Sequence, residues 1–109
     1  MHNLISIAMC SYNGERFIKE QIDSIIAQTY KNFELIIVDD GSKDNTINII
    51  KEYQSKDLRI KLFQNDNNLG FVKNFEKAIS LCSGDFIALA DQDDVWKKNK
   101  LEVFLKNIN

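Results

Sequence analysis

Short apolar runs alternate with amphipathic segments along the whole chain. Four runs are rich in the β-branched and aromatic residues that favour strands, and they cover Leu4–Met9, Phe33–Val38, Ile60–Gln64 and Phe86–Ala90. In the second run, residues 35–38 are apolar without interruption, which is typical of a strand covered on both faces. The pattern therefore predicts four short strands, one of them buried on both sides.

Helical periodicity fills the intervals between these runs. Apolar residues recur there at spacings of three and four, so each segment presents one apolar stripe to a sheet. The stripes consist of Ile18, Ile22, Ile25 and Ile26; Ile47, Ile49, Ile50 and Tyr53; Phe71, Phe75, Ala78, Ile79 and Cys82; and Leu101, Phe104, Leu105 and Ile108. The order βαβαβαβα predicts an α/β fold with a Rossmann-like, mostly parallel sheet and right-handed crossovers.

Turn-forming residues separate the predicted elements, as expected for loops. They are Asn13-Gly14, Asp40-Gly41-Ser42, Asn65 to Gly70 and Ser83-Gly84. Either Ser42 or Asp44 is placed to cap the second helix. Because 109 residues without an internal repeat or linker suit one domain, we expect a single domain over residues 1–109.

Composition narrows the class of protein. The formal net charge of −2 gives no basic footprint for nucleic acid. No apolar run approaches the roughly 20 residues that cross a bilayer, and Leu4–Met9 is too short for a signal sequence. Cys10 and Cys82 are expected to be buried free thiols in a reducing compartment. We therefore expect a soluble, cytoplasmic chain, at the cytoplasmic face of the membrane if a longer protein carries an anchor.

Polar residues that follow the strands are the first candidates for chemistry, because open parallel sheets bind ligands beyond the carboxyl ends of their strands. The loop after the first strand, Cys10 to Glu15, lacks a G-x-G-x-x-G turn, which argues against a nicotinamide or flavin enzyme. In this loop Tyr12 can stack on a base, and the backbone after Cys10 can contact one. The alternative is a polar loop with a half-buried tyrosine.

Two acidic turns follow the second and fourth strands. Asp39 and Asp40 are adjacent carboxylates that can accept hydrogen bonds from a base or ribose, although a helix-capping turn is the alternative. Asp91, Asp93 and Asp94 suit Mg²⁺ or Mn²⁺, whose ligands are hard oxygens. The alternative there is that Asp93 or Asp94 caps the last helix while Trp96 packs in the core. With strand order 3-2-1-4, all these turns would open onto one cleft.

Taken in order, these segments resemble family 2 glycosyltransferases of the GT-A type over nearly the whole chain. The resemblance is carried by Ile5-Ser6-Ile7-Ala8-Met9-Cys10-Ser11-Tyr12-Asn13, Ser24-Ile25-Ile26-Ala27-Gln28-Thr29-Tyr30, Glu34-Leu35-Ile36-Ile37-Val38-Asp39-Asp40-Gly41-Ser42, Asn68-Leu69-Gly70 with Lys73-Asn74, and Asp91-Gln92-Asp93-Asp94-Val95-Trp96. The last segment resembles the D-x-D element in the form found in rhamnosyltransferase-type members.

The resemblance implies metal-dependent binding of a UDP- or dTDP-type sugar, and transfer of that sugar to a saccharide or lipid-linked acceptor in bacterial surface polysaccharide synthesis. It assigns nucleotide contacts to Cys10, Tyr12, Asp39, Asp40, Lys73 and Asp91, and the Mg²⁺ or Mn²⁺ ion to Asp93, with Asp91 as a further ligand. Asp40 would meet the base with Asp39 beside it, and Asp91 would lie near the ribose or sugar. Lys73 stands where many members carry arginine.

The general base of this family is an acidic residue that comes later in the chain. Here only Glu102 follows the acidic turn, within the last predicted helix and on the wrong side, and the sole histidine, His2, has no assigned role. We therefore expect a truncated glycosyltransferase domain that binds nucleotide with metal but transfers sugar poorly or not at all. Its open sheet edge would accept a C-terminal part or a second copy.

Three other classes share parts of this pattern. A receiver domain would carry its acidic pair after the first strand and a phosphorylated aspartate after the third, where Asn65-Asp66-Asn67 stands. A nucleotidyltransferase would need a glycine-rich basic loop, whereas Cys10–Arg16 holds one glycine and one arginine. The third alternative is a non-catalytic nucleotide-binding or interaction remnant of a glycosyltransferase.

Overall fold

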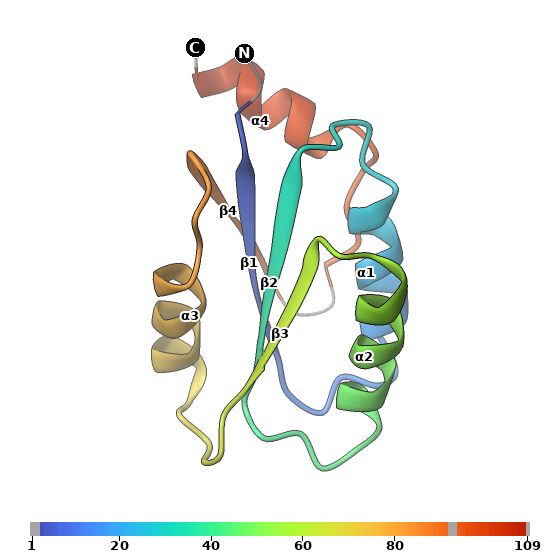
Figure 1. The fold of residues 1–109 in the computed structure, drawn as a ribbon, viewed down its shortest axis with the longest axis vertical. Helices are drawn as coiled ribbons and strands as arrows, with labels where there is room; N and C mark the ends of the chain where they lie inside the picture. Colours follow the sequence, from blue (N-terminus) through green and yellow to red (C-terminus); the bar gives the residue numbers. More distant parts are fainter. Residues whose placement is uncertain (1–2, 92–93, 109) are drawn as a thin grey trace.

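The elements alternate between strand and helix along the chain (Figure 1), as the sequence predicts. The computed structural model describes residues 3–91 and 94–108. Its elements are β1 (Ile5–Ser11), α1 (Ile18–Ile26), β2 (Phe33–Asp39), α2 (Thr46–Lys56), β3 (Ile60–Gln64), α3 (Phe71–Ser80), β4 (Phe86–Ala90) and α4 (Lys100–Ile108). The predicted end of β1 at Met9 is wrong, because its pairing with β2 continues to Ser11.

All four strands form one parallel sheet in the order β3-β2-β1-β4, which confirms the expected order. The register pairs Ser11 of β1 with Asp39 of β2, and Met9 of β1 with Ala90 of β4. The loops that follow β1, β2 and β4 therefore leave the sheet at the same edge, which is the lower edge in Figure 1. β3 and β4 are the two edge strands of this sheet.

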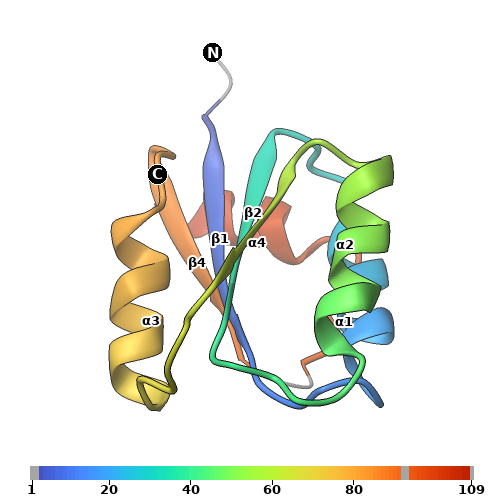
Figure 2. The same ribbon diagram turned by 60° about the horizontal axis from the view of Figure 1, so that its bottom comes forward.

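Helices cover both faces of the sheet, with α3 on one side and α1 and α2 on the other (Figure 2). Because side chains alternate along a strand, β1 sends Ile5, Ile7 and Met9 into the larger core beneath α1, α2 and α4. Ala8 of β1 joins a smaller core that is completed by Ile36, Val38 and Ala78. β2 is buried along its whole length, as predicted from its uninterrupted apolar run.

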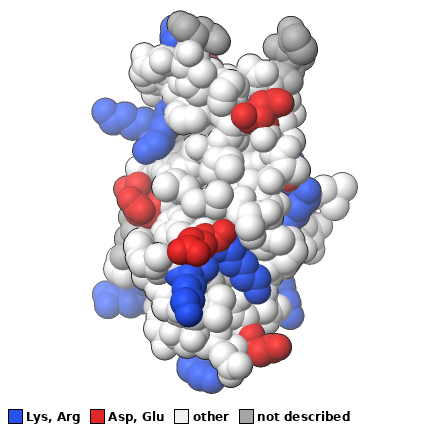
Figure 3. Space-filling model, turned by 90° about the vertical axis from the view of Figure 1, so that its left-hand side faces the viewer, with Lys and Arg blue, Asp and Glu red and all other residues white. Residues whose placement is uncertain are grey.

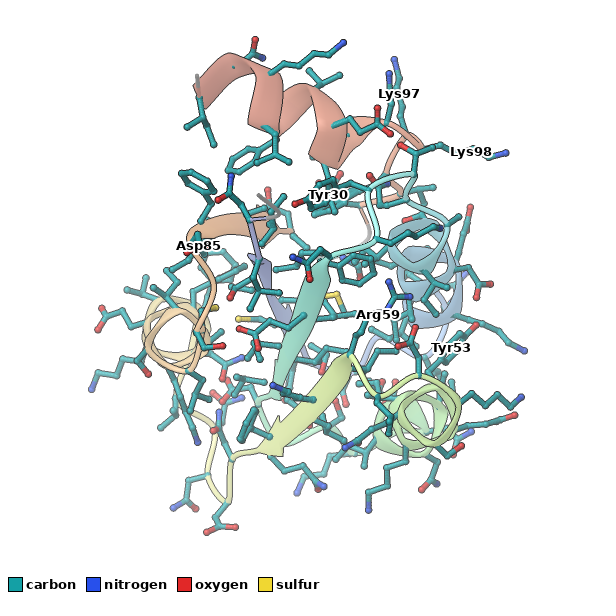
Figure 4. All side chains as sticks on the ribbon, turned by 45° about the horizontal axis from the view of Figure 1, so that its top comes forward. Tyr30, Tyr53, Arg59, Asp85, Lys97 and Lys98 are labelled. Atoms are coloured by element: carbon teal, nitrogen blue, oxygen red, sulfur yellow. The ribbon has the colours of Figure 1, made fainter. Side chains whose placement is uncertain are left out.

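Two side chains, labelled in Figure 4, form hydrogen bonds with the backbone just before β1, at the amino end of the sheet. Asp85 accepts a hydrogen bond from the Leu4 amide at 2.8 Å, and the Tyr30 hydroxyl donates to the Asn3 carbonyl. In the part of the chain that the structure describes, no helix is long and apolar enough to span a bilayer.

A buried carboxylate, Glu34, organises the amino end of the sheet beneath α3. It is 5% exposed and accepts hydrogen bonds from the Ser6 hydroxyl at 2.5 Å, the Ser83 amide at 2.7 Å and Lys61 Nζ at 3.1 Å. Burial by itself would raise the pKa of Glu34, but these donors outweigh it and lower the pKa to about 2. The charged form of Glu34 is therefore part of the folded structure.

Glu34→Gln is expected to lower the free energy of unfolding at pH 7 by about 2 kcal/mol, because Lys61 and the Ser83 loop would then donate to a neutral amide instead of a charged carboxylate. The folded pKa of Glu34 lies below its ordinary value of 4.5, so this stabilisation is complete above pH 4.5 and is lost as the pH falls toward 2. Urea unfolding across that range checks it. A difference between the two proteins that stays constant down to pH 2 would contradict it.

Candidate functional site

A cavity of about 280 Å³ opens at the carboxyl end of β1, the strand from which the sheet extends in both directions. Parallel sheets bind ligands at such switch points. The cavity is lined by Cys10, Ser11, Tyr12, Asp40, Asn68, Gly70, Phe71, Asn74 and Phe75. The lining thus includes Cys10, Tyr12 and Asp40, three residues that the sequence analysis singled out.

Aromatic rings flank this cavity. Tyr12 is 44% exposed and Phe71 68% exposed, and the ring of Phe71 meets that of Phe75 edge to face at 5.1 Å. Exposed ring faces beside a cavity are suited to stacking on a planar ligand. Tyr12 is half-buried, as the alternative interpretation of its loop expects, and it also lines this cavity.

Cys10 contributes a neutral thiol to the cavity wall. Burial raises the pKa of Cys10 to about 12, and a hydrogen bond from Asn74 only partly offsets it. Such a thiol is a poor nucleophile and serves as a small apolar surface. Cys10 and Cys82 are free, as predicted, but both are half-buried, so the expectation of full burial is wrong.

Asp40 is held as an ionised acceptor at the wall of the cavity, where it is 5% exposed. Its Oδ1 accepts the Leu69 amide at 2.7 Å and Asn65 Nδ2 at 2.9 Å, while its Oδ2 accepts the Gly70 amide at 3.0 Å. Burial would raise the pKa of Asp40, but these donors lower it below its ordinary value. A carboxylate has about four acceptor positions, so one remains on Oδ2.

Asp39 points away from Asp40, and it does not line the cavity. Its Oδ1 accepts the hydroxyls of Ser11 at 2.7 Å and Ser42 at 2.6 Å, and its Oδ2 accepts the amides of Gly41 at 3.1 Å and Ser42 at 2.8 Å. These bonds shape the turn in which Gly41 adopts φ +90°. Neither residue predicted to cap α2 occupies its N-cap position, which is Asn45; Asp44 accepts the amide of Thr46 at 3.0 Å, and Ser42 serves this turn.

The acidic turn after β4 is only partly described. Asp91 is exposed, and its carbonyl accepts Gln21 Nε2 at 2.5 Å; Asp93 lies outside the described residues. Trp96 is buried, as expected for a core anchor. The suggestion that Asp94 caps the last helix is wrong, because α4 begins only at Lys100.

Within residues 3–91 and 94–108, no group of three or more His, Cys, Asp or Glu side chains is arranged to hold a metal ion. Asp91 nevertheless has the right chemistry for one ligand. Its carboxylate is exposed at the sheet edge that carries the cavity, and Mg²⁺ and Mn²⁺ prefer carboxylate oxygens together with water and phosphate. Lys73 is exposed on α3 and does not line the cavity.

Several residues that line or support the cavity have no role predicted from the sequence. They are Asn65, Asn68, Gly70, Phe71, Asn74 and Phe75. One signal was available in Asn74, because it occupies a position in the apolar stripe that runs from Phe71 to Ala78. A polar residue on the buried face of a helix needs partners inside the protein, and such residues are candidates for a site.

The surface around α3 carries both signs of charge. Figure 3 shows lysine and arginine side chains beside aspartate and glutamate side chains on this face, with no extended region of one sign. Binding to a polyanionic nucleic acid favours a clustered basic patch, and this face does not present one.

The sequence matches the family model described as "Glycosyl transferase family 2" over residues 6–109. It is 45% identical over 100 residues to the UDP-Glc:alpha-D-GlcNAc-diphosphoundecaprenol beta-1,3-glucosyltransferase WfgD of Escherichia coli, covering 92% of this chain and 39% of that protein. The structure superimposes on S. aureus TarS 1-349 in complex with UDP with a TM-score of 0.87, at 32% identity, covering 99% of this chain and 32% of the other.

A second solved structure supports the fold alone, because its identity is 21%. It is the mannosyltransferase PcManGT from Pyrobaculum calidifontis in complex with GDP-Man and Mn²⁺, with a TM-score of 0.89 over 97% of this chain and 32% of the other. The four-stranded order and its helices are those of the Rossmann-like part of GT-A glycosyltransferases. The chain spans 39% of the length of the E. coli enzyme and 32% of each of these two solved chains.

Cys10 is expected to react with iodoacetamide at pH 7.5 about a thousandfold more slowly than an ordinary thiol, because its pKa is raised from 9.0 to about 12 and only the thiolate reacts. The measurement uses a Cys82→Ser background and follows adduct formation by mass spectrometry. The same chain in urea serves as the control. Equal rates in the folded and unfolded chain would show that the Cys10 thiol is not shielded.

Proposed function

Because the chain belongs to glycosyl transferase family 2, we propose that it forms the donor-nucleotide site of a glycosyltransferase, which transfers sugar from a UDP- or dTDP-type donor to a hydroxyl of a saccharide or lipid-linked acceptor. The observation that carries this proposal is Asp40, an ionised carboxylate with one open acceptor position in a cavity flanked by exposed rings. Uracil and thymine carry a ring N–H that suits such an acceptor.

The proposed donor contacts follow from where the residues lie. Asp40 accepts the ring N–H of the base, while Tyr12 and Cys10 line the space around it. Asp39 supports the turn beside Asp40 through its own saturated hydrogen bonds. Lys73, exposed one position before the cavity-lining Asn74, has the reach and charge to meet a phosphate outside the base cavity.

A divalent cation, Mg²⁺ or Mn²⁺, is proposed to be held by Asp93, with Asp91 as a further ligand near the ribose or sugar. The exposed carboxylate of Asp91 fits this donor set, and a structural neighbour is in complex with GDP-Man and Mn²⁺. When bound, such an ion stabilises the negative charge that develops on the departing nucleoside diphosphate.

Transfer itself also needs a general base for the acceptor hydroxyl. In the described part of the chain, the carboxylates of Asp39 and Asp40 are engaged in hydrogen bonds, and Glu102 is exposed on α4 and does not line the cavity. We therefore propose that the 109-residue chain binds donor but transfers sugar poorly, and that a C-terminal part or a second copy completes the site. A remnant that binds nucleotide without catalysis is the second candidate, favoured by the same observation.

The biological setting is proposed from the relatives and the cysteines. The match to an E. coli enzyme whose name specifies a diphosphoundecaprenol-linked acceptor supports a role in bacterial surface polysaccharide synthesis. Two free thiols suit a reducing compartment, which supports a cytoplasmic location at or near the membrane face.

Isothermal titration of the chain with UDP, dTDP and GDP tests the nucleotide site. We expect UDP or dTDP to bind, and Asp40→Asn to weaken that binding about tenfold or more, because the new amide opposes the ring N–H instead of accepting from it. Asp66→Asn makes the same charge change in the exposed loop nearby and should bind as the wild type does. The absence of binding to every nucleotide would refute the proposed function.

Asp93→Ala is expected to abolish the gain in UDP affinity that Mn²⁺ produces, while metal-free binding persists, because the base cavity is formed by other residues. Titrations with and without Mn²⁺ measure this gain, and Asp66→Ala is the matched control. A full Mn²⁺-dependent gain in folded Asp93→Ala would remove Asp93 from the metal site.

A further inference from the structure

A chain of hydrogen bonds leads from the surface of α3 to Asp40. Lys77 Nζ donates to Asn65 Oδ1 at 2.6 Å, and Asn65 Nδ2 donates both to Asp40 Oδ1 at 2.9 Å and to Asn74 Oδ1 at 2.7 Å. Asn74 Nδ2 in turn donates to the carbonyl of Val38 at 2.9 Å. Both asparagines are buried, at 9% and 2% exposure.

Packing alone does not account for these two amides. Asn74 lies on the face of α3 that packs on the sheet, where Ala78 is fully buried in an apolar cluster. A buried amide there costs stability unless all its groups are bonded, and an apolar side chain would avoid that requirement. The position therefore supplies directed hydrogen bonds, which a hydrophobic residue would lack.

The direction of each bond is set by Lys77. An ammonium only donates, so it holds the oxygen of Asn65 toward itself and turns the NH₂ group of Asn65 toward Asp40 and Asn74. A flipped Asn65 amide would place its oxygen against two other oxygens and its NH₂ against a cation. Asp40 therefore receives a donor from this chain and is never offered an acceptor.

We propose that Asn65, Asn74 and Lys77 are positioning residues that keep Asp40 an ionised acceptor and thereby make the site select a pyrimidine with a ring N–H, uracil or thymine, over cytosine. The inference rests on the proposed function, because it assumes that a base reaches Asp40. Uracil N3–H can donate to the open position on Asp40 Oδ2. Neutral cytosine has a lone pair at N3, so two acceptors would face each other, and sites of this kind discriminate strongly.

The discrimination holds only while Asp40 is charged, since a protonated Asp40 would offer an O–H to cytosine. Among the described residues, the charged and titratable groups that face it are Cys10 from β1 and Lys77 from α3. Cys10 is a neutral thiol whose own pKa is raised by burial and by the charge of Asp40, and Lys77 acts on Asp40 through Asn65. Asp39 on the same strand is turned to Ser11, and Asp66 in the adjoining loop is exposed. Loss of the Asn65 donor removes one of the bonds that lower the pKa of Asp40.

The test compares UMP with CMP on the 109-residue chain by isothermal titration between pH 4 and 8. We expect the wild type to prefer UMP. Asn65→Leu should weaken UMP binding about tenfold with little effect on CMP, and Lys77→Met should weaken it about threefold. In both variants the acidic limb of UMP binding should move to higher pH. Lys51→Met, which removes an exposed lysine from α2, should match the wild type within about twofold.

Two different results would distinguish a failure of the proposed function from a failure of this inference alone. A wild type that binds neither UMP nor CMP would overturn the proposed function and this inference together. A wild type that prefers UMP, with an unchanged UMP-to-CMP ratio and an unchanged acidic limb in Lys77→Met and Asn74→Leu, would overturn this inference alone. Lys77 is only half-buried, so its methionine variant keeps the comparison available even where an asparagine variant fails to fold.

Discussion

The site depends on how the fold accommodates two adjacent carboxylates at the end of its most buried strand. Asp39 is the last residue of β2 and Asp40 is the first residue after it, and their side chains bind different segments of the chain. Asp39 binds Ser11 and the Gly41–Ser42 turn, while Asp40 binds the loop that leads into α3. Each charge is thus stabilised by protein donors, and together the two residues hold the loops that border the cavity.

A buried carboxylate surrounded by hydrogen-bond donors occurs at both ends of the sheet, but the two carboxylates serve different purposes. At the amino end, Glu34 is surrounded by donors from Ser6, Ser83 and Lys61, and it serves the fold. At the carboxyl end, the donors around Asp40 leave one acceptor position beside a cavity. A buried charge that the protein satisfies incompletely is suited to recognition, because a ligand that supplies the remaining donor gains from a site already arranged for it.

Much of the architecture was readable from the sequence, because the signals for it are local. Apolar periodicity located all four strands and four helices, and three strands had their observed ends or were within one residue of them. The rule that ligands lie beyond the carboxyl ends of parallel strands directed attention to Tyr12 and Asp40, which the structure places in one cavity. The family resemblance also rested on short segments and their order, and the family match over residues 6–109 confirms it.

What the sequence by itself determined, then, is the order of elements, the sheet and the general position of the site. Only the tertiary structure decided which polar residue does what, since that depends on contacts between segments far apart in the chain. Asp39 and Asp40 look equivalent in the sequence, yet Asp39 is bound by Ser11, whereas Asp40 is bound by the loop that leads into α3. The roles of Asn65, Asn74 and Lys77 arise only when α3 packs on β2, because hydrogen bonds depend on direction and distance that no local pattern encodes.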